Sequence, residues 1–187
     1  MSEPQQRTHW QWEGYVAWEA DQPVRYELVD DKDYAMGGGT AAHDRIANAL
    51  WVELPLKLRH SPCRPHGPDM KVQTGTGNGR YPDALIDCGA YVPDAYQAQA
   101  PVAVFEVLSR STAWIDPGKQ LRDYDATPGI KYYVLISQDE PRAMLYTRND
   151  NGRLDIRDAI LLEDAGASLS LPALGLSIPL EAIYGTA

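Results

Sequence analysis

A chain of 187 residues with 44% hydrophobic content is long enough to bury a core and too apolar to be disordered over most of its length. The formal net charge of −9 argues against a protein that coats nucleic acid nonspecifically, because such proteins neutralise phosphates with Lys and Arg. The N-terminus lacks the basic start and apolar core of a signal peptide, and no apolar run approaches the ~20 residues that a membrane span needs. We therefore expect a cytoplasmic protein with no membrane partner.

The N-terminal residues 1–22 predict an irregular arm. They are rich in tryptophan, with Trp10, Trp12 and Trp18, and show no clear period. We expect these indoles to dock the arm on the core or on a second subunit, with stacking on nucleic-acid bases as the alternative. The rest of the chain, residues 23–187, is predicted to form a single domain.

A hairpin and a long helix are predicted next. Tyr26–Val29 and Asp33–Met36 flank an Asp-rich turn, which is typical of two paired strands. After a run of glycines, Thr40 is a suitable N-cap for a helix over residues 41–58. Apolar side chains spaced four apart in this segment predict one buried stripe: Ile46, Leu50 and Leu54.

The middle of the chain predicts a loop followed by strands. Residues 61–69 are Pro-rich and predict a loop, and residues 70–74 predict a strand. The glycine-rich segment 75–79 predicts a hairpin turn, since a phosphate-binding loop would need a helix to follow it. Ala84–Asp87 predicts another strand, and Val102–Leu108 is an apolar run interrupted by one acid, which indicates a buried central strand with a functional group.

The last third of the chain completes an α/β pattern. Asp116 as N-cap and Pro117 at the first helical position predict a helix that ends near Thr127–Gly129. Further elements are predicted as strands at 130–136 and 142–148, peripheral β structure at 154–156 and 169–178, and a closing helical turn at 180–184. The order β-β-α-β-β-β-α-β-β predicts an α/β fold with a mixed central sheet.

Two acids in the central strands suggest a metal site. Because side chains alternate along a strand, Asp83 and Glu106 converge if their strands are neighbours. Burying two unpaired carboxylates is costly, and a divalent cation would remove that cost. Carboxylate oxygens suit Mg²⁺ or Mn²⁺ better than zinc. From spacing alone, satisfaction of the acids by neighbouring arginines or backbone N–H groups is an equally good explanation.

Lys119 lies in the first turn of the helix that follows the Glu106 strand. From there it could return toward the strand end and stabilise charge on a phosphoryl group, which a bound metal would also polarise. By helical spacing Lys119 shares a face with Arg122 and Asp123, so a solvated surface charge is the alternative.

The cysteines and histidines offer a weaker site. Cys63 and Cys88 follow no close-spaced pattern, and we interpret them as reduced thiols in a cytosolic protein. His60, Cys63 and His66 are a zinc alternative, although the segment supplies no obvious fourth ligand.

An ordered set of segments resembles the Uma-two family of restriction-endonuclease-like proteins, within the PD-(D/E)XK nuclease superfamily. The segments are Tyr26-Glu27-Leu28-Val29, His43, Tyr81-Pro82-Asp83, Phe105-Glu106-Val107-Leu108-Ser109, Ser111-Thr112-Ala113, Asp116, Lys119, Tyr124, Gly129-Ile130-Lys131-Tyr132-Tyr133-Val134 and Leu174-Gly175-Leu176-Ser177-Ile178. Each piece alone is weak, and their order from Tyr26 to Tyr184 makes the resemblance specific. It implies a restriction-endonuclease-like fold: a mixed central sheet flanked by helices, with an α-β-β-β-α-β core and extra β elements at both ends.

The resemblance also implies a set of site residues. Asp83 and Glu106 would be metal ligands, with the Val107 carbonyl as a third. Glu27 would be an added acid that acts near the metal through water, and His43 an accessory polar residue.

The chain departs from the implied pattern at two positions. Leu108 stands two residues after the acid Glu106, where the superfamily usually has its lysine, so the resemblance implies that Lys119 on the helix takes this role. Arg110 stands where the family usually has proline, and with Lys119 and Arg122 it would form a local positive patch.

Two function classes follow. The first is a Mg²⁺- or Mn²⁺-dependent endonuclease that hydrolyses phosphodiester bonds of nucleic acid, with DNA as the preferred substrate and a homodimer as a suitable assembly. The second is a non-catalytic binding or assembly module that keeps the fold and acts through protein partners, which the net charge of −9 favours. A hydrolase of another small phosphate ester is a third alternative.

Overall fold

The computed structural model describes residues 10–108 and 118–185. Its main sheet is built from β3 (Arg64–His66), β6 (Ala84–Asp87), β7 (Pro101–Leu108), β8 (Tyr132–Ser137), β9 (Ala143–Thr147) and β10 (Ile160–Leu162). A second sheet contains β1 (Tyr26–Val29), β2 (Lys32–Ala35), β4 (Val72–Gln73) and β5 (Gly79–Arg80). A third sheet contains β11 (Ser168–Leu171) and β12 (Leu176–Pro179). The helices are α1 (Trp12–Ala20), α2 (Ala41–Leu58), α3 (Gly118–Asp125) and α4 (Leu180–Tyr184), with 3₁₀ turns at Ile156–Asp158 and Pro172–Leu174.

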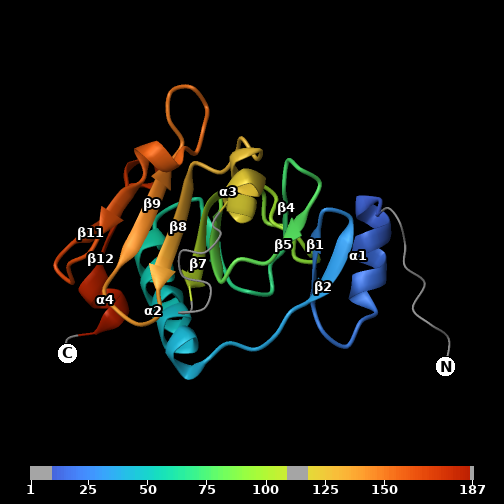
Figure 1. The fold of residues 1–187 in the computed structure, drawn as a ribbon, viewed down its shortest axis with the longest axis horizontal. Coiled ribbons are helices and arrows are strands. Elements are labelled where there is room, and N and C mark those ends of the chain that lie inside the picture. The colour runs from blue at the N-terminus through green and yellow to red at the C-terminus, as the bar shows by residue number, and fades with distance from the viewer. Residues whose placement is uncertain (1–9, 109–117, 186–187) are drawn as a thin grey trace.

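The six-stranded main sheet is mixed, in the order β10-β9-β8-β7-β6-β3 (Figure 1). β7 and β8 are parallel, and the other neighbours in this sheet are antiparallel. Parallel neighbours need a crossover connection, and α3 lies in the segment between these two strands. The four-stranded sheet has the order β2-β1-β5-β4 and lies with α1 toward one end of the molecule, opposite β11, β12 and α4 (Figure 1).

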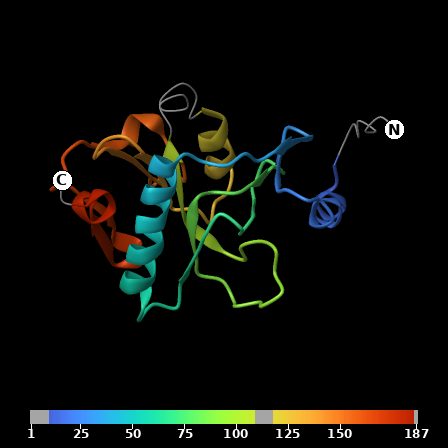
Figure 2. The ribbon, with the colours of Figure 1, turned by 90° about the horizontal axis from the view of Figure 1, so that it is seen from below.

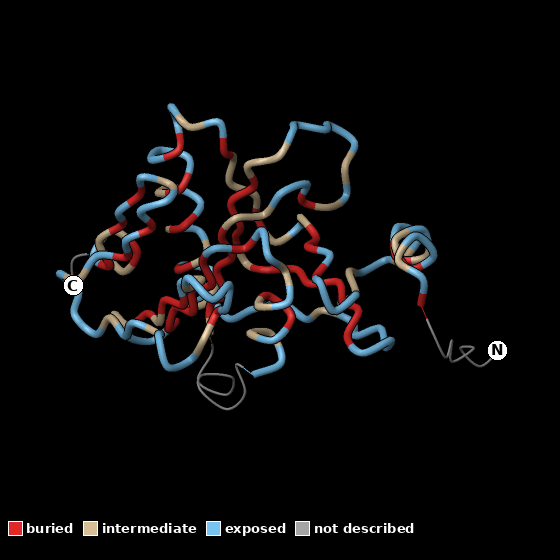
Figure 3. The backbone as a smooth tube through the Cα atoms, turned by 90° about the horizontal axis from the view of Figure 1, so that it is seen from above, coloured by how far each residue is buried: buried red, intermediate tan, exposed pale blue. Residues whose placement is uncertain are grey.

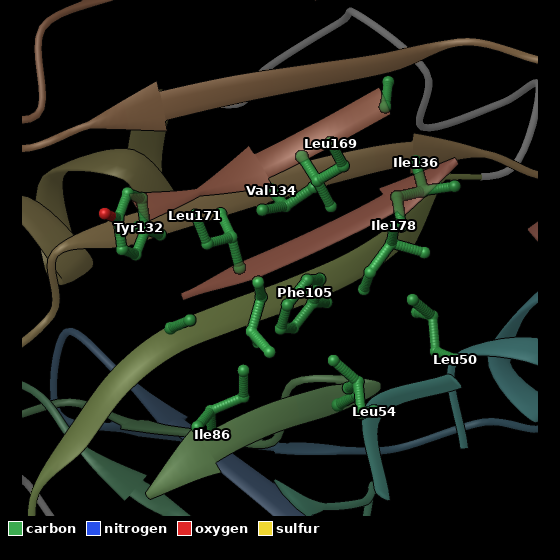
Figure 4. Close-up of a cluster of buried hydrophobic side chains, with 14 of the residues drawn as sticks. Leu50, Leu54, Ile86, Phe105, Tyr132, Val134, Ile136, Leu169, Leu171 and Ile178 are labelled. Carbon is green, nitrogen blue, oxygen red and sulfur yellow. The ribbon is translucent and has the colours of Figure 1, made fainter. Parts of the chain in front are cut away.

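One face of the main sheet is covered by α2 and by the C-terminal elements (Figure 2). The predicted stripe on α2 is fully buried, and Leu50 and Leu54 enter the same apolar interior as Phe105 and Ile178 (Figure 4). Burying each such side chain contributes roughly 1.5–3 kcal/mol. α2 and α4 contact each other beside this core.

The opposite face of the main sheet carries a second core. Because strand side chains alternate, Phe105 points into the first core while its neighbour Val104 joins Tyr124 of α3 and Tyr133 of β8 in the second. Buried residues therefore concentrate along the central strands, while the outer loops are exposed (Figure 3). Glu106 projects from β7 toward the α3 side, where Tyr124 contacts it.

The structure confirms the predicted α/β fold with a mixed central sheet. The first hairpin, the helix over 41–58 and the closing helical turn are also confirmed. The expected strand at 154–156 is wrong, because a 3₁₀ turn occupies Ile156–Asp158 and the edge strand β10 forms four residues later at Ile160. The predicted N-cap Asp116 and Pro117 lie outside the described residues.

The prediction of an irregular N-terminal arm is wrong, because α1 forms over Trp12–Ala20. Its aromatic side chains are spread around the helix, and Gln11 gives no side-chain cap, so neither a stripe nor a cap marked it in the sequence. Tyr15 is fully buried against Leu28, and Trp18 lies 5.0 Å from the Tyr26 ring. The indoles thus pack on their own chain, while the domain boundary at residue 22 stays a prediction.

The interpretation of the cysteines as reduced thiols is also wrong in this structure, where Cys63 and Cys88 form a disulfide. The Pro-rich segment contains a short edge strand, β3, whose Arg64 pairs with Asp87 of β6. Continuing that antiparallel register by one residue places the two cysteines opposite each other. Because the sulfur of Cys63 is in a disulfide, it cannot act as the thiolate ligand of a zinc site with His60 and His66.

Across the two described ranges, no helix combines the length and the apolar character needed to cross a membrane.

Candidate active site

Asp83 and Glu106 meet where β6 and β7 lie side by side. The register pairs Ala84 with Phe105, so Asp83 immediately before β6 lies beside Glu106 on β7. The backbone N–H of Val107 donates to Oδ2 of Asp83 at 2.7 Å. The two strands are neighbours, as the predicted convergence required.

An open cavity of about 530 Å³ lies above this pair. Its walls come from the β1–β2 hairpin, the glycine-rich segment before α2, the start of α2 and the end of β7. The lining includes Glu27, His43, Asp83, Glu106, Val107 and Gln120, together with residues 34–40. Four of the five residues assigned catalytic roles from the sequence therefore line one cavity, and Lys119 does not belong to this lining.

Glu106 is a buried acid, 8% exposed. Burial, and after it the charges of Asp83 and Glu27, raise the pKa of its carboxyl group well above the ordinary value. The hydroxyl of Tyr124 donates to Oε1 of Glu106 at 2.9 Å and opposes that rise. A cation near Glu106 would favour its charged form.

Asp83 is held by the start of α2 as well as by β7. Nε2 of His43 lies 3.2 Å from Oδ2 of Asp83. This hydrogen bond is the largest cause that raises the pKa of His43 above its ordinary value. Thr40 caps α2 by accepting from the His43 N–H at 3.2 Å, and its hydroxyl donates to Oε1 of Gln138 at 3.1 Å.

In each acid, described residues donate hydrogen bonds to one carboxylate oxygen and none to the other. The hydrogen bonds from described residues reach Oδ2 of Asp83 and Oε1 of Glu106. Within residues 10–108 and 118–185, none reaches Oδ1 of Asp83 or Oε2 of Glu106. In a strand the N–H and C=O of one residue point to the same side, so the Val107 carbonyl also faces Asp83. It lies past the last pairing of β7 with β6.

Glu27 has a different partner, Arg80 of β5. Nη1 of Arg80 lies 2.9 Å from Oε2 of Glu27, and the Tyr81 N–H donates to the other oxygen at 3.1 Å. Arg80 also donates through Nε and Nη2, at 2.8 and 2.7 Å, to Oδ2 of Asp123 on α3. An arginine therefore neutralises Glu27 and Asp123. Neutralisation by arginine was the alternative considered for Asp83 and Glu106.

Lys119 points away from the acids. Its side chain is 58% exposed, and its Nζ lies 3.6 Å from Oδ2 of Asp30 in the β1–β2 turn. The next residue, Gln120, faces the cavity instead. The structure brings Lys119 to the hairpin rather than to Asp83 and Glu106, so its assisting role stays a prediction. Of the other two basic residues of the expected patch, Arg122 has its Nη2 3.9 Å from Oδ1 of Asp30, and Arg110 lies outside the described residues.

The donors at this site fit a hard divalent cation with several water ligands. In the described part of the chain, no three His, Cys, Asp or Glu side chains are grouped closely enough to enclose an ion. Two carboxylates and a backbone carbonyl would leave the remaining positions to water. Mg²⁺ usually keeps several waters and binds through one or two carboxylates, so this donor set suits it.

The Uma2 family model, described as "Putative restriction endonuclease", matches residues 12–181. The chain belongs to the Uma2 family. Its sequence is 33% identical over 175 residues to the uncharacterized protein slr1290 of Synechocystis sp., covering 92% of this chain and 90% of that protein. The resemblance inferred from the ordered segments is confirmed.

A solved structure supports the same fold for this Uma2 chain. The structure of this chain is similar, with a TM-score of 0.72, to a crystal structure described as that of a putative nuclease belonging to DUF820 from Anabaena variabilis. The match covers 92% of this chain and 96% of that chain at 14% sequence identity. At this identity the likeness shows the fold.

Several residues that shape the site were missed in the sequence. Gln120 and Tyr124 both contact Glu106 from α3, and Arg80 links Glu27 to Asp123. A signal for Arg80 existed, because a basic residue directly before Tyr81 in a short strand is well placed to neutralise a nearby acid. The spacing did not show which of Gln120 and Lys119 faces Glu106, because the rotation of a helix about its own axis is set by its packing on the sheet.

Proposed function

We propose that this Uma2 protein is a divalent-metal-dependent nuclease that hydrolyses phosphodiester bonds, with DNA as the preferred substrate. The observation that carries the proposal is the convergence of Asp83 and Glu106 on one cavity, each with an oxygen that no described residue binds. Membership of the Uma2 family, described as "Putative restriction endonuclease", supports it.

The metal, Mg²⁺ or Mn²⁺, would be held by Oδ1 of Asp83, Oε2 of Glu106 and the Val107 carbonyl. Such an ion, when bound, polarises a phosphoryl oxygen and lowers the pKa of its bound water. The neighbouring residues keep the acids in place: Val107 N–H and His43 fix Asp83 through Oδ2.

Glu27 has a separate role in this proposal. Arg80 holds its carboxylate at the cavity wall, where Glu27 would orient a water molecule bound to the metal. Lys119 assists the attacking water only if its side chain leaves Asp30. Because that side chain is exposed and paired elsewhere, we expect Lys119→Ala to reduce cleavage less than removal of either acid.

Cleavage of labelled DNA and RNA with Mg²⁺ or Mn²⁺ tests the proposal. Wild type is expected to cut only with metal, and Asp83→Asn and Glu106→Gln, which keep the side-chain volume, are expected to reduce cutting to background. Asp94→Asn, an exposed acid in a loop, is the matched control and is expected to cut as wild type does. Cutting that persists in both acid variants would reject this site.

The second candidate function, a binding or assembly module, has an observation of its own. The described lining of the cavity holds three acids, Glu27, Asp83 and Glu106, and no Lys or Arg. Such a surface attracts a phosphate backbone poorly in the absence of metal. A protein that binds Mn²⁺ through Asp83 and Glu106 but cuts no nucleic acid in the panel would favour this candidate.

The homodimer and the cytoplasmic location stay predictions. Light scattering coupled to gel filtration measures the first directly: a mass near twice 20.7 kDa supports a homodimer.

A further inference from the structure

α3 presents two neutral side chains to the site, Gln120 and Tyr124, one helical turn apart on the same face of the helix. We propose that these two are positioning residues that orient Glu106 for the metal, so that α3 contributes a hydrogen-bonding pair to the site. The inference rests on the proposed metal-dependent function and extends it to residues that do not touch the ion.

Both side chains act on the same oxygen. The Tyr124 hydroxyl donates to Oε1 of Glu106 at 2.9 Å, and Nε2 of Gln120 lies 3.4 Å from that oxygen. With Oε1 held, rotation of the carboxylate is restricted and Oε2 stays directed to the cavity. The short contact makes Tyr124 the stronger of the two positioning residues.

The position of the Tyr124 hydroxyl is itself fixed by packing. Tyr124 is fully buried, and its ring lies 4.9 Å from that of Tyr133. Its backbone carbonyl accepts from Nη2 of Arg148 at 3.0 Å. On the same helix, Asp123 is bound by Arg80. Because these contacts fix Tyr124, its hydroxyl group cannot move with the Glu106 carboxylate, and rotation of that carboxylate would break the hydrogen bond.

Gln120 is held by Tyr133. The Tyr133 hydroxyl donates to Oε1 of Gln120 at 3.3 Å, which directs the amide nitrogen of Gln120 toward Glu106. The result is a chain of donors from Tyr133 through Gln120 to Glu106. A neutral donor at this position holds the carboxylate without adding positive charge beside the cation, which the ammonium group of a lysine would do.

Mn²⁺ affinity of the full chain, measured by calorimetry or by electron paramagnetic resonance, tests the inference without reliance on turnover. Tyr124→Phe removes the hydroxyl and keeps the ring, so we expect about tenfold weaker Mn²⁺ binding, in the range for residues that support metal ligands. Gln120→Ala is expected to weaken binding by less, because its contact with Glu106 is longer.

Tyr146→Phe is the matched control. Tyr146 is fully buried in the same core, with its ring 5.6 Å from that of Tyr133, but its hydroxyl is directed to Sδ of Met144 at 2.9 Å. Its loss is expected to leave Mn²⁺ affinity unchanged. Circular dichroism of each variant confirms that the fold is retained, and if Tyr124→Phe does not fold, the half-buried Gln120 decides the outcome through Gln120→Ala.

The outcomes separate this inference from the proposed function. Mn²⁺ binding that depends on Asp83 but is unchanged in Tyr124→Phe and in Gln120→Ala overturns the positioning role and leaves the metal site standing. Equal weakening in Tyr124→Phe and Tyr146→Phe also overturns it, because packing alone would then explain the loss. Absence of Mn²⁺ binding by wild type overturns the metal site and this inference together.

Discussion

At the scale of single residues, the buried carboxyl group of Glu106 lowers the stability of the folded protein. The residue is buried beside two other acids, and its pKa is raised well above the ordinary value by burial first and by those charges second. An acid whose pKa is higher in the folded than in the unfolded state makes the fold less stable as pH rises from the unfolded pKa to the folded pKa, and the loss is complete above the folded pKa. Without a cation, Glu106 therefore destabilises the neutral-pH protein.

Glu106→Gln is expected to raise the melting temperature of the metal-free protein. The gain should be small near pH 4 and grow as pH rises above the ordinary pKa of a glutamate, because only the wild-type carboxyl group ionises more readily in the unfolded state than in the folded one. A chain of this size gains about 2–4 °C for each kcal/mol of stability. Thermal melts across pH measure this, and added Mn²⁺ should stabilise wild type alone. A melting temperature of Glu106→Gln below that of wild type across the whole pH range would contradict it.

Arg80 and Asp123 form a buried ion pair, in which Arg80 also holds Glu27. Asp123 is fully buried and also accepts from Thr76 and Asn78 through Oδ1. Asp123→Ala is expected to destabilise the fold by about 3–5 kcal/mol, because the guanidinium loses a buried partner. Lys119→Ala breaks an exposed ion pair and is expected to cost less than about 1 kcal/mol. Urea unfolding measures the loss in the free energy of unfolding for each variant. An equal loss in the two variants would mean that burial of the Arg80–Asp123 pair adds nothing to stability.

The individual acids of the site were predictable, and their supporting residues were not. Asp83 and Glu106 interrupt apolar strand patterns, and that interruption is visible in the sequence. The sequence placed Tyr124 on a helix, but its direction toward Glu106 depends on how that helix packs on the sheet. Gln120 and Lys119 exchange faces when the helix rotates by one residue, which no sequence period specified.

At the scale of elements, predictions succeeded where local pattern and burial agree. α2 has a strong N-cap at Thr40 and a stripe of buried residues at Ile46, Leu50 and Leu54, and the predicted and observed bounds coincide. β7 is an apolar run with a single acid, as expected for a central strand. α1 and β3 lack such local signals and owe their structure to packing: the aromatics of α1 dock around Leu28, and β3 pairs only at the sheet edge with β6.

The disulfide between Cys63 and Cys88 ties the edge strand β3 to β6, the strand that follows Asp83. The two cysteines are 25 residues apart in sequence, and closing a loop of that size contributes about 3 kcal/mol. Cys63→Ala with Cys88→Ala is therefore expected to lower the stability of the fold by this amount. A reducing agent should lower the melting temperature of wild type and leave the double variant unchanged. No response of wild type to reduction would contradict a structural role for the bond.

At the scale of the whole molecule, charge sets the conditions for substrate binding. The net charge is −9, and the described cavity lining adds carboxylates where a phosphate would approach. We therefore expect a labelled DNA strand to bind weakly to the metal-free protein and more tightly when Mg²⁺ is added. Fluorescence anisotropy measures the change, and in Glu106→Gln the gain with Mg²⁺ should be lost. Equal binding with and without metal in wild type would speak against this mode of recognition.

The overall architecture was predictable from the order of its elements. In the four-stranded sheet, the β1–β2 hairpin, a strand over 70–74 and the turn over 75–79 were also predicted, and β4 lies within that strand. The pairing of β1 with β5, which joins these elements into one sheet, was not predicted, because it rests on a single register pair between distant segments. That sheet nevertheless supplies Glu27 and Arg80, so part of the site depends on pairing between distant segments.

The location of a bound metal ion tests the proposed site most directly. Crystals of the full chain soaked in Mn²⁺ would show it by anomalous scattering. We expect an ion bound by Oδ1 of Asp83, Oε2 of Glu106 and the Val107 carbonyl, with water completing its shell. Mn²⁺ that binds elsewhere in the chain, with no ion between these residues, would contradict it.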